Sequence, residues 1–122
     1  MASDKFDRSV RIWINAALKK MDAASHVGLL FWKWNSRMTS TMGRAYLPSY
    51  IEFSLPLFEK ATPAQRRQVV YHEVAHIVDG YNFTYNPKRP HSKSWRALMH
   101  RAGVPALRCH DVPVVSRQRR TR

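Results

Sequence analysis

Residues 62–80 constrain the fold of this chain more than any other part of the sequence. The run Thr62-Pro63-Ala64-Gln65 has the pattern of a capping box with proline at the first helical position. In such a box the Thr62 hydroxyl accepts from the backbone N–H of Gln65, whose side chain reaches back to the backbone of Thr62. Gly80 suits the left-handed conformation that ends helices. The sequence therefore predicts a helix from Pro63 to about Asp79.

This predicted helix carries His72, Glu73 and His76. Residues four apart project from one helix face a single turn apart, which is the separation that two imidazoles need to share one tetrahedral zinc ion. Glu73 lies about 100° around the helix from His72, beside the metal, where a general base belongs. Zinc makes water more acidic, and a neighbouring carboxylate can take its proton and pass it to the leaving amine. The pattern H-E-x-x-H predicts a zinc metallopeptidase; the plainer alternative is two histidines that hydrogen-bond locally.

A catalytic zinc ion has three protein ligands and one open position, so a third ligand is needed. The remaining histidines are His26, His91, His100 and His110. His91 follows a loop that is long enough to turn the next helix back across the first two ligands. His100 lies inside that helix, His26 precedes the predicted strands and His110 follows the core. We therefore expect His91 to be the third ligand.

Two further roles near the site stay open in the sequence. Asp79, one turn beyond His76, either orients a ligand or is an exposed carboxylate near the helix end. A tyrosine hydroxyl could stabilise the oxyanion, and Tyr71, Tyr81 and Tyr85 are equal candidates.

The other helices and strands are predicted from the spacing of apolar residues and from the glycine, proline and serine residues at the ends of segments. Apolar residues at helical spacing predict an amphipathic first helix from Ser3 or Asp4 past Met21, with Gly28 closing the segment. Alternating residues between 29 and 55 predict three short strands in an antiparallel sheet. Pro56 can start a brief helical turn. Ser92 or Ser94 can cap a last helix that ends at Gly103.

The chain is strongly basic, with 21 Lys plus Arg against 8 Asp plus Glu and a formal charge of +13. The charge is still +9 without the four arginines of residues 116–122, so it belongs to the domain itself. Such a field favours polyanions, most commonly nucleic acid, although an acidic protein or a membrane surface is attracted in the same way. A solvated basic surface is the plain alternative.

Two basic clusters have positions that suit an anionic ligand. Lys33, Arg37 and Arg44 flank the aromatic residues of the strand region, where cations can hold phosphates while rings stack on bases. We expect Trp32 and Trp34 to point inward as core instead. A second cluster could draw an anionic substrate toward the zinc because it surrounds His91 in sequence: Lys88, Arg89 and Lys93.

Cys109 is the only cysteine, so an intrachain disulfide and an all-cysteine zinc site are excluded and a reducing compartment is favoured. The first residues lack a signal-peptide core, and no apolar stretch is long enough to span a bilayer. We expect a monomeric cytoplasmic protein, nucleoid-associated or in the host cytoplasm if viral. It should form one domain over residues 1–115 with a disordered basic tail over residues 116–122.

Several segments together resemble the SprT-like metalloprotease domain, to which Spartan belongs. The similarity runs from about residue 6 to 112 and rests on these stretches: Trp34-Asn35-Ser36-Arg37, Ser40-Thr41-Met42-Gly43-Arg44, Tyr50-Ile51-Glu52-Phe53-Ser54, Pro56-Leu57-Phe58, Val70-Tyr71-His72-Glu73-Val74-Ala75-His76 and Pro90-His91-Ser92-Lys93-Ser94-Trp95-Arg96-Ala97-Leu98-Met99. The resemblance implies a zincin-like α+β fold, with His72, His76 and His91 as zinc ligands and Glu73 as the catalytic base. It also implies cleavage of proteins attached to DNA.

The chain departs from this family in one respect. Members typically continue into a four-cysteine zinc ribbon that contributes to DNA binding, whereas here only Arg108-Cys109-His110-Asp111 resembles its beginning. Any contact with DNA, single-stranded DNA included, would have to use the domain's own charge.

Two functions are therefore compared. The first is a zinc endopeptidase that acts on DNA-associated proteins, with Glu73 as base. The second is a non-proteolytic, zinc-stabilised module that binds nucleic acid or an acidic protein. The sequence favours the peptidase, because a binding module has no need of a glutamate beside the metal.

Overall fold

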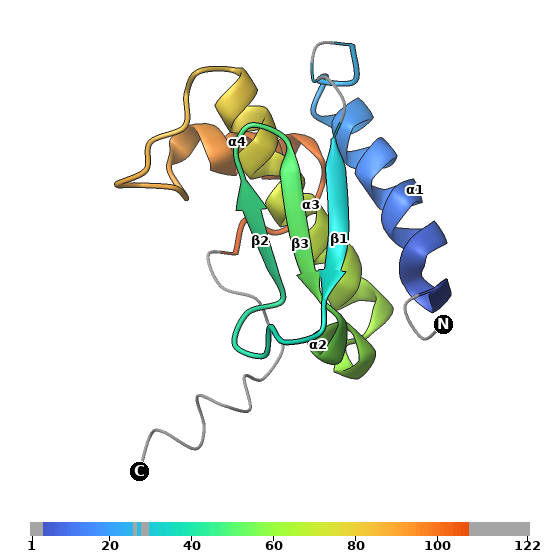
Figure 1. Cartoon of the computed structure of the whole chain (residues 1–122). Helices are drawn as coiled ribbons and strands as arrows, with labels where there is room; N and C mark the ends of the chain where they lie inside the picture. Colours follow the sequence, from blue (N-terminus) through green and yellow to red (C-terminus); the bar gives the residue numbers. More distant parts are fainter. Residues whose placement is uncertain (1–3, 26, 28–29, 108–122) are drawn as a thin grey trace.

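The protein is described by a computed structural model that covers residues 4–25, 27 and 30–107 (Figure 1). Its elements in chain order are α1 (Asp4–Lys20), β1 (Phe31–Asn35), β2 (Gly43–Tyr46), β3 (Tyr50–Ser54), α2 (Leu55–Lys60), α3 (Pro63–Tyr81) and α4 (Lys93–Arg101). The predicted α+β class is confirmed. The predicted boundary between residues 1–115 and the tail 116–122 lies outside the described ranges.

The sheet is mixed, so the prediction of an antiparallel sheet was wrong. Its order is β1-β3-β2, with β1 parallel and β2 antiparallel to the central strand β3. The short turn over residues 47–49 makes β2 and β3 antiparallel neighbours. The longer connection over residues 36–42 leaves room for β3 to insert between β1 and β2. Alternation of apolar residues marks a strand but does not encode its neighbours.

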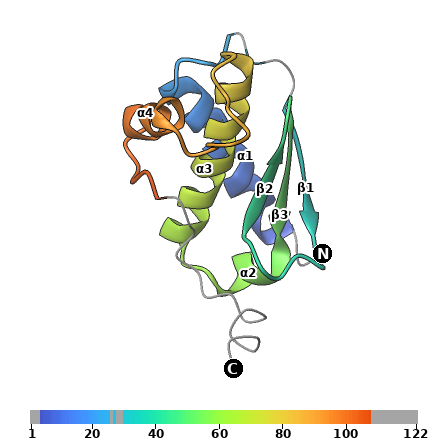
Figure 2. The same cartoon turned by 90° about the vertical axis from the view of Figure 1, so that its left-hand side faces the viewer.

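Helix α3 runs through the centre of the molecule. Figure 2 shows it between the sheet on one side and α4 on the other, with α1 also packed along it. Every residue from Val69 to Asp79 is buried. A helix that is covered on all sides can carry polar groups only where they have a purpose or a partner. The buried His72, Glu73 and His76 are therefore conspicuous.

Helix α1 is amphipathic, as predicted. Its apolar stripe is buried against α3 and consists of Phe6, Val10, Ile14, Ala17 and, just after the helix, Met21. Trp34 from β1 packs edge-on against Phe58 of α2, and its indole N–H donates to Asp7 at 2.7 Å. Trp32 also packs against the core. The interpretation of both tryptophans as inward-facing is confirmed.

The capping box at the start of α3 is present as predicted. The backbone N–H of Gln65 donates to the Thr62 hydroxyl at 3.1 Å, and the backbone N–H of Thr62 donates to the Gln65 side chain at 2.8 Å. Such a cap stabilises a helix by about 1 kcal/mol. The cap fixes the residue at which α3 begins, and thereby the direction in which His72, Glu73 and His76 face.

The end of α3 differs from the prediction, because Gly80 does not stop the helix. Phe83 takes the left-handed conformation instead, with φ of 60°. The N–H groups of Phe83 and Thr84 donate to the carbonyls of Gly80 and Asp79, the bond pattern of a Schellman motif. The close packing of Leu47 explains why residue 80 is a glycine, because a Cβ at this position would lie 3.0 Å from the Leu47 side chain.

The other two long helices end in the same way. After α1 the left-handed residue is Asp22, with φ of 57°, and the predicted terminator Gly28 lies outside the described residues. After α4 it is Gly103, with φ of 77°, as predicted. Within the described ranges, no helix is both long enough and apolar enough to cross a membrane.

Candidate metal centre

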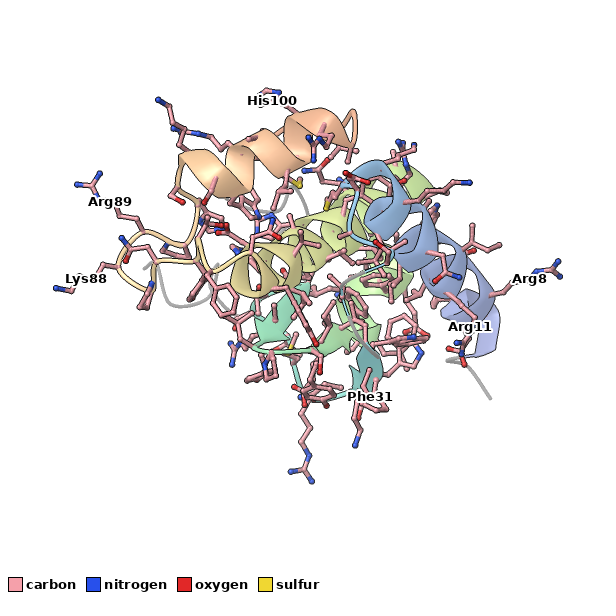
Figure 3. All side chains as sticks on the ribbon, turned by 90° about the horizontal axis from the view of Figure 1, so that it is seen from above. Arg8, Arg11, Phe31, Lys88, Arg89 and His100 are labelled. Atoms are coloured by element: carbon pink, nitrogen blue, oxygen red, sulfur yellow. The ribbon has the colours of Figure 1, made fainter. Side chains whose placement is uncertain are left out.

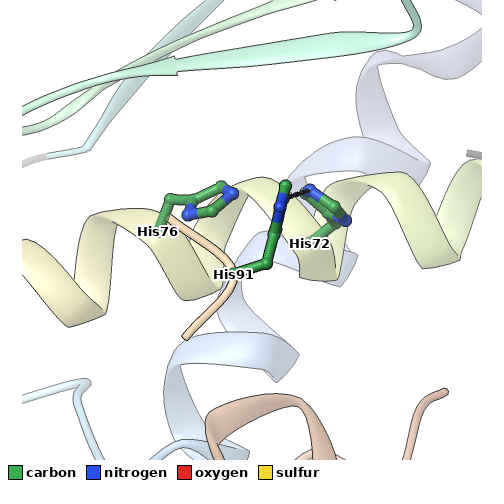
Figure 4. Close-up of side chains that lie close together, drawn as sticks. All are labelled: His72, His76 and His91. Carbon is green, nitrogen blue, oxygen red and sulfur yellow. Dashed lines mark hydrogen bonds between the residues drawn. The ribbon is translucent and has the colours of Figure 1, made fainter. Parts of the chain in front are cut away.

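Two histidines of one helix and a third from a loop converge on one point (Figure 4). His72 and His76 come from successive turns of α3, and His91 comes from the loop before α4. The Nε2 atoms of His72 and His91 are 3.1 Å apart, and one ring nitrogen from each histidine lies within 4.8 Å of the others. Bonds of about 2.0–2.1 Å to a tetrahedral zinc ion place two nitrogens about 3.4 Å apart. The three imidazoles could therefore hold a metal ion with little movement.

The indole ring of Trp95, on α4, packs against all three imidazoles. Its ring centroid is 4.8 Å from that of His72, 5.5 Å from that of His76 and 4.6 Å from that of His91. The side chain is fully buried, and its indole N–H donates to the carbonyl of His72 at 3.2 Å. Sequence reasoning assigned Trp95 only to the last helix. Trp95 stands four residues after His91, on the buried face of an amphipathic helix. This position could have indicated that it packs near the third histidine.

Glu73 lies beside the histidines, at the contact between α3 and the edge strand β2. Its side chain is 3% exposed. A Cβ at Gly43, the first residue of β2, would lie 3.0 Å from Cγ of Glu73 and 3.3 Å from its Oε2. Glycine therefore permits the close approach of the strand to the carboxylate. In the described part of the chain β2 pairs only with β3, so the strand next to Glu73 is an edge strand of the sheet.

The loop that carries His91 is attached to α3 at its start. The Thr84 hydroxyl donates to the carboxylate of Asp79, and the Thr84 backbone bonds to the Asp79 carbonyl at 3.1 Å. Asp79 is fully buried, so the alternative of an exposed carboxylate was wrong. Through these bonds Asp79 anchors the loop that positions His91.

The three tyrosines that are candidates for stabilising the oxyanion have different surroundings in the structure. Tyr71 is buried in the core, where the cationic groups of Lys20 and Arg67 lie over its ring. Tyr81 packs against the core cluster. The ring of Tyr85, in contrast, meets that of His76 edge-on, with centroids 6.3 Å apart and planes at 89°. Of the three, Tyr85 is the one in contact with a candidate ligand.

The remaining sequence candidates lie elsewhere. His100 sits on the exposed side of α4 and points away from the centre (Figure 3). His26 and His110 lie outside the described residues, as does Cys109. Lys88 and Arg89 are exposed on the loop before His91 and project outward from it, while Lys93 begins α4.

Fold and site together define an α+β domain with a candidate three-histidine metal centre, and comparison with known proteins gives its family. The chain belongs to the SprT-like family, whose model matches residues 11–116.

Among curated proteins, the chain is 37% identical over 81 residues to the protein named Protein SprT from Vibrio parahaemolyticus serotype O3:K6 (strain RIMD 2210633). It is 32% identical over 81 residues to Protein SprT from Vibrio atlanticus (strain LGP32). Each match covers 65% of this chain and 48% of the relative, so the chain spans about half the length of these relatives. No solved structure matches it.

Proposed function

We propose that the protein is a zinc-dependent endopeptidase of zincin-like architecture, with His72, His76 and His91 as metal ligands and Glu73 as general base. The observation that carries the proposal is the convergence of three ring nitrogens within 4.8 Å, beside a buried glutamate on the same helix. A set of three imidazoles suits zinc and leaves one position open. The buried glutamate favours catalysis over a purely structural metal, since a structural site has no use for it.

Each residue has a role in peptide hydrolysis. Zinc, when bound, supplies Lewis-acid chemistry that polarises the scissile carbonyl and makes water more acidic. The Glu73 carboxylate accepts the proton of the attacking water and transfers it to the leaving amine. The Tyr85 hydroxyl, carried on the loop beside His76, donates a hydrogen bond to the carbonyl oxygen as that atom gains charge. Trp95 keeps the three imidazoles in place through its contacts with all of them.

The edge strand β2 provides a place for the substrate. An extended peptide can pair with the edge of β2 that faces away from β3, since β-strand addition uses backbone hydrogen bonds of this kind. Gly43 begins that strand against Glu73, so a paired peptide passes next to the base. The formal charge of +13 favours substrates that are acidic or are associated with nucleic acid. Proteins bound to DNA are the substrate class that we propose.

The test is the substitution Glu73→Gln in the whole chain, with zinc content measured on the same samples. Cleavage of casein and of a DNA-bound basic protein should fall by at least about a thousandfold, while zinc stays bound, because an amide cannot accept the proton. Undiminished cleavage by the variant would refute the mechanism. A zinc-loaded wild-type protein that cleaves neither substrate would favour the alternative of a non-proteolytic binding module.

A further inference from the structure

The outer face of the sheet carries a row of aromatic side chains. In the strand register Phe31 of β1 and Tyr46 of β2 both lie opposite Tyr50 of β3, so the three residues cross the sheet side by side. Phe31 is 56% exposed and Tyr46 is 40% exposed. Apolar rings on a sheet face normally turn inward, as Trp32 and Phe53 do here. The helices pack on the opposite face of the sheet, so the described elements leave this row accessible (Figures 1 and 2).

The rings are held in a fixed arrangement. Tyr46 and Tyr50 are stacked, with centroids 5.5 Å apart and planes at 28°. The Tyr50 hydroxyl donates to Glu52 at 2.8 Å, and the Asn35 amide donates to the other oxygen of the same carboxylate at 3.1 Å. Burial and the hydrogen bond to Glu52 raise the pKa of Tyr50 to about 12. A surface that is pre-arranged in this way loses little entropy when a flat ligand binds.

Cations lie directly beside the aromatic row. The next row of the register reads Lys33, Glu52 and Arg44 across the three strands. The carboxylate in the middle accepts from Tyr50 and Asn35, and the two flanking cations leave the row with a net positive charge. Figure 3 shows Phe31 projecting on the sheet side of the molecule, well away from His100 on α4.

We propose that this outer sheet face, formed by Phe31, Tyr46, Tyr50, Lys33 and Arg44, binds single-stranded nucleic acid. Bases stack on exposed rings whatever their sequence, while neighbouring cations hold the phosphates. The chain's charge of +13 complements such a polyanion. Duplex DNA fits less well, because its bases are already stacked on one another. The surface requires neither metal nor catalysis, but it deepens the proposed function by locating the nucleic-acid contact.

The test measures binding of fluorescein-labelled oligothymidylate to the whole chain by anisotropy. Phe31→Ala and Tyr46→Ala should each weaken binding about tenfold, since each removes a ring on which a base would stack. Tyr46→Phe keeps the ring and should bind like the wild type. Ile12→Ala is the matched control, because Ile12 is 55% exposed but lies on α1 and not on the sheet. Thermal melting should show that all four variants are folded.

The charged residues are tested separately. A plot of log affinity against log salt concentration has a negative slope, because salt weakens binding. Lys33→Gln and Arg44→Gln should each make this slope shallower by about 0.7, as expected when one phosphate contact on a single strand is lost. Arg8→Gln on α1 makes the same charge change elsewhere and should have a smaller effect. The proposal is overturned if the two alanine variants bind as tightly as the wild type. It is also overturned if polyglutamate or anionic vesicles compete as well as unlabelled oligothymidylate.

Discussion

Gly43 of the edge strand and Glu73 of the central helix approach so closely that a Cβ at position 43 would lie 3.0 Å from Cγ of the glutamate. This close approach joins the strand on which we propose the substrate lies to the group that we propose as base. Ala at position 43 would press on the side chains of Glu73 and Val69, at 3.0 and 3.1 Å, and would displace them by a few tenths of an ångström; no histidine is among its nearest neighbours. Catalysis depends on the position of the base to within such distances.

Gly43→Ala should therefore lower kcat about tenfold while the zinc content stays that of the wild type. Steady-state cleavage kinetics and metal analysis check both parts. Gly103→Ala is a useful control for the loss of a glycine, since Gly103 follows α4 and a Cβ there meets nothing within 4 Å. It should reduce stability through its φ of 77° but leave kcat unchanged. A Gly43→Ala enzyme with full kcat would show that this close approach does not position the base.

Tyr85→Phe should lower kcat by about tenfold to a hundredfold and leave KM and zinc content unchanged. The ring that contacts His76 is retained, and only the hydroxyl that we assign to the oxyanion is lost. Tyr81→Phe, four residues earlier, is the control and should behave like the wild type. If Tyr85→Phe also keeps full kcat while Glu73→Gln is inactive, the peptidase proposal stands and the role of Tyr85 fails.

Phe83→Gly should stabilise the protein by about 0.5–1 kcal/mol. Phe83 is left-handed and 95% exposed, so glycine relieves the backbone and removes no packing. The free energy of unfolding in urea measures the change. Asn82→Gly provides the comparison, because Asn82 has an ordinary φ of −82° and glycine there should destabilise. Equal effects of both substitutions would contradict this explanation of the helix end.

Glu52 should make the stability of the sheet depend on pH. Hydrogen bonds from Tyr50 and then Asn35 lower its pKa below the ordinary value of 4.5. A depressed folded-state pKa means that the ionised carboxylate stabilises the fold above pH 4.5, and that this contribution is lost as the pH falls through the lowered pKa. The difference in Tm between wild type and Glu52→Gln should therefore shrink below pH 4.5. NMR titration of Tyr50→Phe should show the Glu52 pKa rising toward 4.5; an unchanged pKa would contradict the assigned cause.

The sequence predicts those parts of the fold that short-range chemistry determines. The capping box of Thr62 and Gln65 places the start of α3, and the apolar stripe of α1 follows from its spacing. Pairing of strands is decided by tertiary contacts, so the parallel neighbours β1 and β3 were missed. Helix ends were predicted from glycines, yet Asp22 and Phe83 take the left-handed positions after α1 and α3. Packing against Leu47 explains Gly80, and only the structure reveals it.

The candidate site was more accessible to sequence reasoning than the fold. Its first two histidines are neighbours on one helix, and His91 was chosen from its position before the next helix. Trp95 and Gly43 were missed because each acts through contacts made across long stretches of chain. The choice among Tyr71, Tyr81 and Tyr85 likewise needed the three-dimensional arrangement, which brings Tyr85 to His76.

The measurement that tests the central claim most directly is the zinc content of purified wild-type protein beside that of His91→Ala. His100→Ala is the matched control, because His100 lies on the exposed side of α4. After dialysis against a weak chelator, the wild type and His100→Ala should keep one zinc ion per chain, whereas His91→Ala should lose it. Retention of zinc by His91→Ala at the wild-type level would contradict the three-histidine centre.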